Sequence, residues 1–166
     1  MACRGVHFSL DEPTVNALKA IGGDLERLQF IQERIEEDYF KNHPEWLAET
    51  DKAWDYIHRV LTDGELEWNN GTYPLNHVVM GGEPLYSESD NIVSLKTPKQ
   101  VADAANELRQ ITEVSFRAKF FQLDEFEIAH TYEEDFEYTW EWFQRLRTFW
   151  LRAAAEGRYV LFSVDQ

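Results

Sequence analysis

Apolar residues alternate with polar or small ones near both ends of the chain. Val6, Phe8 and Leu10 do so near the N-terminus, and residues 159–164 do so near the C-terminus. A period of two predicts a β-strand in each place, and the N-terminal strand is expected to bury one face. Between them, apolar residues recur mostly at spacings of three or four, which predicts helices with one buried side.

The helical pattern divides into segments with identifiable ends. Asp11 and Thr97 suit helix N-caps, and Gly64 and Gly157 suit the ends of helices. The predicted helices cover roughly residues 11–21, 24–41, 51–63, 97–108 and 133–156, with a loop-rich stretch at 65–97 and a short helix or strand at 116–121. The expected buried sides of the second and third helices comprise Leu28, Ile31, Ile35 and Tyr39, and Trp54, Ile57 and Leu61. We therefore predict an α+β fold, a single helix-rich domain over residues 1–166 whose small sheet includes the N- and C-terminal strands.

The charge of the chain narrows its possible partners. Among 166 residues, 31 are acidic and 16 basic, which gives a formal net charge of −15. This charge repels phosphate groups, so we expect no nucleic acid and no membrane as partners, whereas a basic protein is attracted. The longest apolar run has four residues, which is too short for a signal peptide or a membrane helix. With Cys3 alone, no disulfide forms within the chain, and we expect a cytoplasmic protein.

One pair of residues on the third predicted helix could carry acid–base chemistry. Asp55 and His58 are three residues apart, with Asp51 at the start of the same helix, and a carboxylate that orients a histidine is a common catalytic arrangement. A structural pair beside Trp54 is the favoured alternative, because a lone pair without a nucleophile or a metal is weak support for catalysis. The histidines lack the spacing of metal ligands, and Gly81-Gly82 is typical of a turn, so no metal or cofactor is predicted.

Two acidic stretches stand out. Residues 124–141 contain eight acidic residues and no lysine or arginine, and residues 24–38 contain six acidic residues against two arginines. Aromatic residues interleave with the acids of the first stretch, which suits a docking surface, although such aromatics also commonly belong to a core. The candidate partner-binding residues are Glu36, Glu37, Tyr132, Glu133, Glu134, Glu137, Tyr138 and Trp142.

Several motifs resemble a known bacterial family. Residues 51–62, Asp-Lys-Ala-Trp-Asp-Tyr-Ile-His-Arg-Val-Leu-Thr, are similar to the signature helix of the YfbM-like family, a bacterial domain of unknown function. The loop with Gly81-Gly82, the helix start at Leu95-Lys96-Thr97-Pro98 and the C-terminal helix with its final strand follow in the family's order. The resemblance implies a fold but no activity. If the family shares a site, the resemblance implies that Asp51, Trp54, Asp55 and His58 line it.

These observations support hypotheses from different functional classes. The first is a non-enzymatic protein-binding module, most specifically an acidic immunity protein that blocks a basic bacterial toxin encoded by a neighbouring gene. The alternative is a small cytoplasmic enzyme that uses Asp55 and His58 in a cleft under the Gly81-Gly82 loop. A structural protein without a docking surface is the third. An enzyme should gather polar residues in a pocket, whereas an inhibitor should present a wide acidic and aromatic face.

Overall fold

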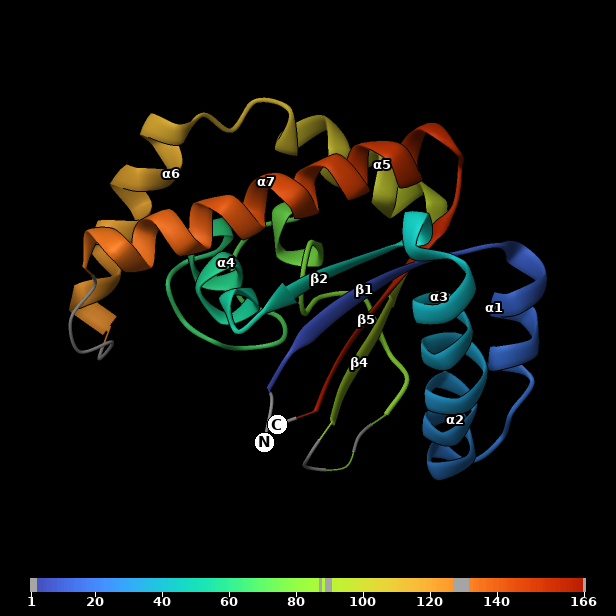
Figure 1. The fold of residues 1–166 in the computed structure, drawn as a ribbon. Coiled ribbons are helices and arrows are strands. Elements are labelled where there is room, and N and C mark those ends of the chain that lie inside the picture. The colour runs from blue at the N-terminus through green and yellow to red at the C-terminus, as the bar shows by residue number, and fades with distance from the viewer. Residues whose placement is uncertain (1–2, 87, 89–90, 127–131, 166) are drawn as a thin grey trace.

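The centre of the computed structural model is a five-stranded antiparallel sheet with the strand order β2-β1-β5-β4-β3 (Figure 1). The structure describes residues 3–86, 88, 91–126 and 132–165, without the side chains of 124–126. The strands are β1 (Gly5–Leu10), β2 (Leu47–Asp51), β3 (Glu83–Pro84), β4 (Asn91–Lys96) and β5 (Tyr159–Asp165). Because β1 and β5 pair along their length, the prediction of an α+β fold with both terminal strands in one sheet is confirmed.

One face of the sheet is covered by the N-terminal helices. These are α1 (Glu12–Lys19), α2 (Asp24–Phe30) and α3 (Glu37–Asn42), with a π-helical segment, Ile31–Glu36, joining the last two. The apolar stripe predicted for this region is buried against strand residues of the same face: Leu28, Ile31, Ile35 and Tyr39 pack with Phe8, Leu10 and Leu161. The spacing of apolar residues therefore located this layer correctly, since one continuous helical path presents them all to the sheet.

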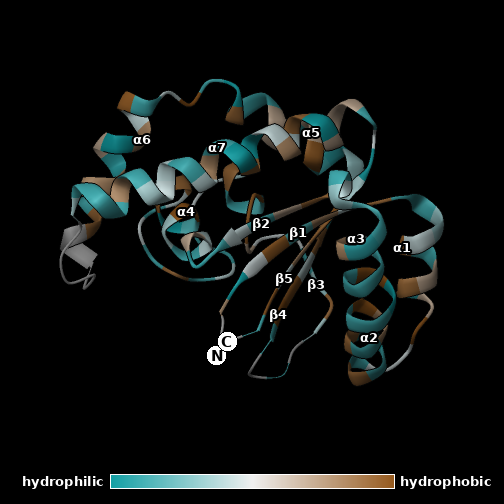
Figure 2. Cartoon of the chain, in the orientation of Figure 1, coloured by the Kyte–Doolittle hydropathy of each residue, from teal (hydrophilic) through white to brown (hydrophobic). Residues whose placement is uncertain are grey.

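The opposite face is covered by α4 (Ala53–Leu61), α5 (Pro98–Leu108), α6 (Glu113–Phe120) and α7 (Glu133–Ala155). Short 3₁₀ turns occupy Pro44–Trp46, Leu75–His77 and Phe121–Phe126. α7 is the longest helix, with 23 residues, and crosses the whole layer. Figure 2 shows that the strands are largely hydrophobic. Along α7, hydrophobic and hydrophilic residues alternate in the same figure. The second core thus lies between α7 and the sheet, where Phe143, Leu146, Trp150 and Phe162 are fully buried.

Helix ends follow the local sequence more closely than strands do. At α5, the Thr97 hydroxyl accepts a hydrogen bond from the Gln100 amide at 3.3 Å, and the Gln100 side chain accepts one from the Thr97 amide at 2.9 Å. This is the expected capping box. The sequence does not predict three of the strands, β2, β3 and β4. Residues 116–121, expected as a short helix or strand, lie mostly in helix α6.

The expectation that β1 buries a single face is wrong. His7 and Ser9 are 0% and 2% exposed, although they alternate with the apolar residues of the strand. The physical reason is that helices cover both faces of the sheet, so residues of either parity are enclosed.

Candidate functional site

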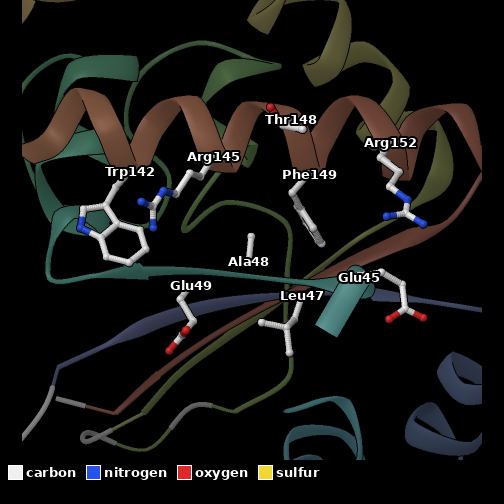
Figure 3. Close-up of a pocket in the computed structure, with 9 residues that line it drawn as sticks. All are labelled: Glu45, Leu47, Ala48, Glu49, Trp142, Arg145, Thr148, Phe149 and Arg152. Carbon is white, nitrogen blue, oxygen red and sulfur yellow. The ribbon is translucent and has the colours of Figure 1, made fainter. Parts of the chain in front are cut away.

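A groove of about 340 Å³ lies between strand β2 and helix α7 (Figure 3). β2 is at the edge of the sheet and pairs with β1 on one side only. Within the described residues, no other strand pairs with its second side, so alternate N–H and C=O groups of β2 point away from the sheet. The groove is lined by Glu45, Leu47, Ala48, Glu49, Trp142, Arg145, Thr148, Phe149 and Arg152.

The α7 side of the groove is a single stripe of the helix. Trp142, Arg145, Phe149 and Arg152 follow one another at spacings of three and four, which places them on neighbouring turns of one side. The Arg145 guanidinium lies 4.9 Å from the centre of the Trp142 ring. Figure 3 shows both arginines directed from α7 toward β2, with the Phe149 ring between them and above Ala48. The groove therefore combines an apolar floor with two cationic side chains.

The acidic surface at the start of α7 adjoins this stripe. Glu134 and Glu137 are exposed, and Tyr132 is 62% exposed. Glu133 is engaged, because Arg117 donates hydrogen bonds to both of its carboxylate oxygens. This ion pair holds the pKa of Glu133 below its usual range. The acidic residues at 124–127, which belong to the predicted acidic stretch, lie outside the part of the chain whose side chains the structure describes.

Tyr138 links the acidic surface to the groove. Its hydroxyl donates a hydrogen bond to Asp51 at 2.6 Å, and its ring packs edge-on against Trp142 at 6.4 Å. Burial, followed by the bond to Asp51, raises the pKa of Tyr138 to about 12. Arg4 adds an ion pair to the same carboxylate at 3.4 Å. Tyr138 and Trp142 thus form a partly exposed aromatic ledge held in place by Asp51.

The other predicted acidic residues belong to the opposite layer of the fold. Glu37 is exposed on α3, whereas Glu36 is half-buried and accepts a hydrogen bond from the Ser163 hydroxyl at 3.2 Å. Burial raises the pKa of Glu36. Since α2 and α3 pack on the sheet face away from α7, their acidic residues do not form one continuous surface with the described acidic residues at the start of α7.

Asp55 and His58 do not form the expected pair. The Asp55 carboxylate accepts a hydrogen bond from Arg59 at 2.6 Å. His58 lies in the core, 1% exposed, rather than on the surface of the helix, and its Nε2 lies 2.8 Å from both the Glu67 carbonyl and the Asn70 side-chain oxygen. Burial lowers the pKa of His58. The histidine therefore organises the loop that follows α4.

The remaining motif residues fix the chain around the start of α4. Asp51 is not helical as predicted; it is the last residue of β2, and its φ of 46° lies in the left-handed region. Aspartate tolerates this region better than most residues. Trp54 is buried, as predicted, together with Ile57 and Leu61. The Trp54 indole N–H donates a hydrogen bond to the Cys3 carbonyl at 2.9 Å and so ties down the N-terminal strand.

A polar cluster that the sequence analysis missed is buried on the α7 face of the sheet. His7 Nε2 donates a hydrogen bond to the Val78 carbonyl at 2.9 Å, and Lys96 Nζ donates to the Val79 carbonyl at 2.6 Å and the Ser94 hydroxyl at 2.7 Å. Burial, then the nearby Lys96, lowers the pKa of His7 to about 3, and burial lowers the pKa of Lys96 well below its usual range. All three side chains have 0% exposure.

This cluster binds the 78–82 segment to the sheet. A Cβ at Gly82, whose φ is 122°, would lie 2.5 Å from the Leu95 carbonyl oxygen, so only glycine lets the segment close against β4. A serine beside a lysine can be a chemically active combination, but Ser94 and Lys96 are both enclosed and cannot meet a substrate. The signal in the sequence was that Lys96 shares the strand parity of Ile92, which faces the core.

The described residues contain no group of three or more histidine, cysteine, aspartate or glutamate side chains placed to hold a metal ion. Within the same residues, no helix is both long and apolar enough to span a bilayer. The groove itself presents the unpaired edge of β2, apolar side chains and two arginines.

Comparison with known proteins places the chain in a family. Residues 1–163 match the domain of unknown function DUF1877. The chain belongs to the DUF1877 family. The crystal structure of YfbM from Escherichia coli, a protein of unknown function, superposes with a TM-score of 0.68 at 22% sequence identity and covers 99% of each chain. No curated protein matches. The resemblance to the YfbM-like family is thus confirmed, and at this identity the structural match concerns the DUF1877 fold.

Proposed function

We propose that this DUF1877 protein is a non-enzymatic module that binds a basic protein partner. In its most specific form, it is a cytoplasmic immunity protein that blocks a basic toxin domain encoded by a neighbouring gene. The observation that carries the proposal is the exposed acidic and aromatic surface at the start of α7, where Glu134 and Glu137 lie near Tyr132 and Tyr138. The net charge of −15 supports it, because it draws a cationic protein toward this surface.

The two components of the surface have separate roles in this proposal. Exposed charges mainly accelerate association, and salt screens them over a Debye length of ~8 Å at physiological ionic strength. Affinity depends instead on a few aromatic anchors that become buried in the complex. Tyr132 is the candidate anchor with the largest exposed fraction, and Tyr138 and Trp142 form the adjacent ledge.

The enzymatic alternative receives less support from the geometry. A general base must lie within hydrogen-bond reach of the proton that it abstracts from the substrate. Asp55 bonds to Arg59, and buried His58 bonds to the loop that follows α4. The groove between β2 and α7 contains neither residue.

Reversing the charge of the acidic surface should slow partner binding. For Glu134→Lys/Glu137→Lys, we expect the association rate with the protein encoded by the adjacent gene to fall about tenfold at low salt, with a flatter dependence on salt concentration. Surface plasmon resonance at two salt concentrations measures both effects. Glu133 is left intact because it holds Arg117.

A matched variant on the opposite layer separates a docking surface from overall charge. Glu26→Lys/Glu33→Lys changes two exposed glutamates of the α2 and π-helical layer and alters the net charge by the same amount. We expect it to slow association less than threefold, since the layer formed by α2 and α3 lies far from the start of α7 (Figure 1). Equal slowing by the two variants would show that net charge alone attracts the partner and would contradict a docking site on α7.

A further inference from the structure

We propose that the groove between β2 and α7 receives an extended segment of the protein partner, which adds to β2 as a further strand and carries basic side chains on one face and acidic or apolar side chains on the other. The inference rests on the proposed function, because it identifies how a protein partner would be held beside the acidic surface. Its basis is the unpaired edge of β2 together with the distribution of charge across the groove.

The dimensions of the groove suit an extended chain. Its α7 side runs from Trp142 to Arg152, and ten helical steps span about 15 Å. β2 has five residues, which span about 17 Å. The two walls therefore have nearly equal lengths and together fit an occupant of about five extended residues. A strand gains backbone hydrogen bonds along such an edge, while pockets beside it select alternate side chains.

Charge is distributed differently on the two walls. The α7 wall carries Arg145 and Arg152 on either side of Phe149, whereas Glu49 belongs to β2. Figure 3 shows Glu49 and Leu47 directed away from α7. Side chains of an added strand alternate between the same two directions. The face toward α7 therefore meets two cations and an aromatic ring, and the face beside Glu49 meets a carboxylate, which together specify the alternating pattern.

The arginines are available to such a segment at small cost. Arg145 pairs with Glu141 at 2.5 Å and Arg152 with Glu156 at 3.0 Å, each one turn away on the same helix. All four side chains are at least 36% exposed. Exposed ion pairs of this spacing contribute little to stability. A carboxylate that arrives in the groove can therefore replace either intrahelical partner.

The other edge of the sheet is not equivalent. β3 has two residues, Glu83 and Pro84, and proline cannot donate to a neighbouring strand. Such short, proline-containing edges are a common protection against strand addition. β2 is longer and contains no proline. Of the two edge strands, β2 is thus the one that can accept a partner.

A peptide with the specified pattern tests the proposal on the intact protein. The probe is acetyl-Lys-Glu-Lys-Leu-Lys-Glu-Lys-amide, and the control is a peptide of the same composition in which the alternation is removed. NMR titration of the isotopically labelled chain should shift the backbone amides of residues 47–51 and slow their hydrogen exchange. We expect the control peptide to bind at least tenfold more weakly. Methylating alternate backbone nitrogens of the probe should also abolish binding, because it removes the hydrogen bonds along β2.

Protein variants provide a second test, in which binding in the groove and attraction by net charge predict opposite changes in affinity for the probe. Arg145→Glu/Arg152→Glu should weaken binding of the cationic probe at least tenfold. The matched control, Arg34→Glu/Arg109→Glu, changes two exposed arginines outside the groove and gives the same net charge. If net charge alone governs binding, both variants bind the cationic probe more tightly than the wild type does. Tighter binding by the groove variant would therefore overturn the inference. Equal binding of the probe and the control peptide, or amide shifts centred outside β2, would overturn it as well.

The outcome separates this inference from the proposed function. Glu134 and Glu137 do not line the groove, so charge reversal there tests the acidic surface independently. If Glu134→Lys/Glu137→Lys slows association of the protein partner but the peptide does not bind at β2, strand addition is refuted and the binding module remains supported. Peptide binding at β2 with partner association unaffected by Glu134→Lys/Glu137→Lys would support the groove and refute the acidic docking surface.

Discussion

Replacing Trp54 with alanine is expected to lower the free energy of unfolding by ~3–5 kcal/mol, the usual cost of truncating a large aromatic side chain in a core. The side chain is 3% exposed, and its ring lies 5.8 Å from that of Phe162 on β5. The substitution also removes the indole donor to the Cys3 carbonyl. A loss of this size corresponds to a Tm lower by roughly 10 °C in a chain of this length. Urea unfolding and calorimetry measure the two quantities.

Trp68→Ala is the matched control for this substitution. Trp68 is 43% exposed, and surface substitutions usually change stability by less than about 0.5 kcal/mol. Comparable losses in the two variants, or a loss below about 1 kcal/mol for Trp54→Ala, would contradict the packing described for α4.

Acidification should destabilise the protein through His7. Its pKa is lowered from 6.5 to about 3 in the folded state, so between these pH values the unfolded chain binds a proton that the folded chain does not. Stability attributable to His7 is therefore complete above pH 6.5 and is lost as the pH falls toward 3. The full effect is about 5 kcal/mol, of which about 2 kcal/mol is lost by pH 5.

His7→Gln isolates this contribution. Glutamine can still donate a hydrogen bond to the Val78 carbonyl but does not titrate. Between pH 7.5 and pH 5, the free energy of unfolding of the wild type should fall about 2 kcal/mol further than that of the variant. Urea unfolding at both pH values measures the difference. Parallel pH profiles for the two proteins would mean that folding does not lower the pKa of His7, and would contradict its enclosure beside Lys96.

Much of the architecture was predictable because it depends on local spacing. The stripe from Leu28 to Tyr39 and the capping box at Thr97 are set by residues within a few positions of each other. The same holds for α7: its predicted range, 133–156, differs from the observed range, Glu133–Ala155, by one residue at the C-terminal end. The alternation at both chain ends predicted β1 and β5, although their pairing was inferred only from their positions. The burial of Trp54 followed from helical period alone.

The strands that depend on distant partners were not predictable in this way. β2 is a short, partly charged segment that becomes a strand because β1 lies beside it. Its location moved Asp51 from the predicted helix to the end of a strand and created one wall of the groove. The other wall is α7, nearly a hundred residues away in the chain. No local pattern relates the two walls, so the site depends on how the layers pack.

The sequence by itself determined most of the helices, the terminal strands, the acidic charge and the family membership suggested by the motif around Trp54. Tertiary structure decided which polar residues are enclosed and which are available. It buried His7 and Lys96 because both faces of the sheet are covered, and it directed Asp55 and His58 to different partners. It also placed the acidic residues of α2 and α3 and the described ones at the start of α7 on opposite layers. Burial and contact are properties of neighbours in space, whereas periodicity reports only neighbours in sequence.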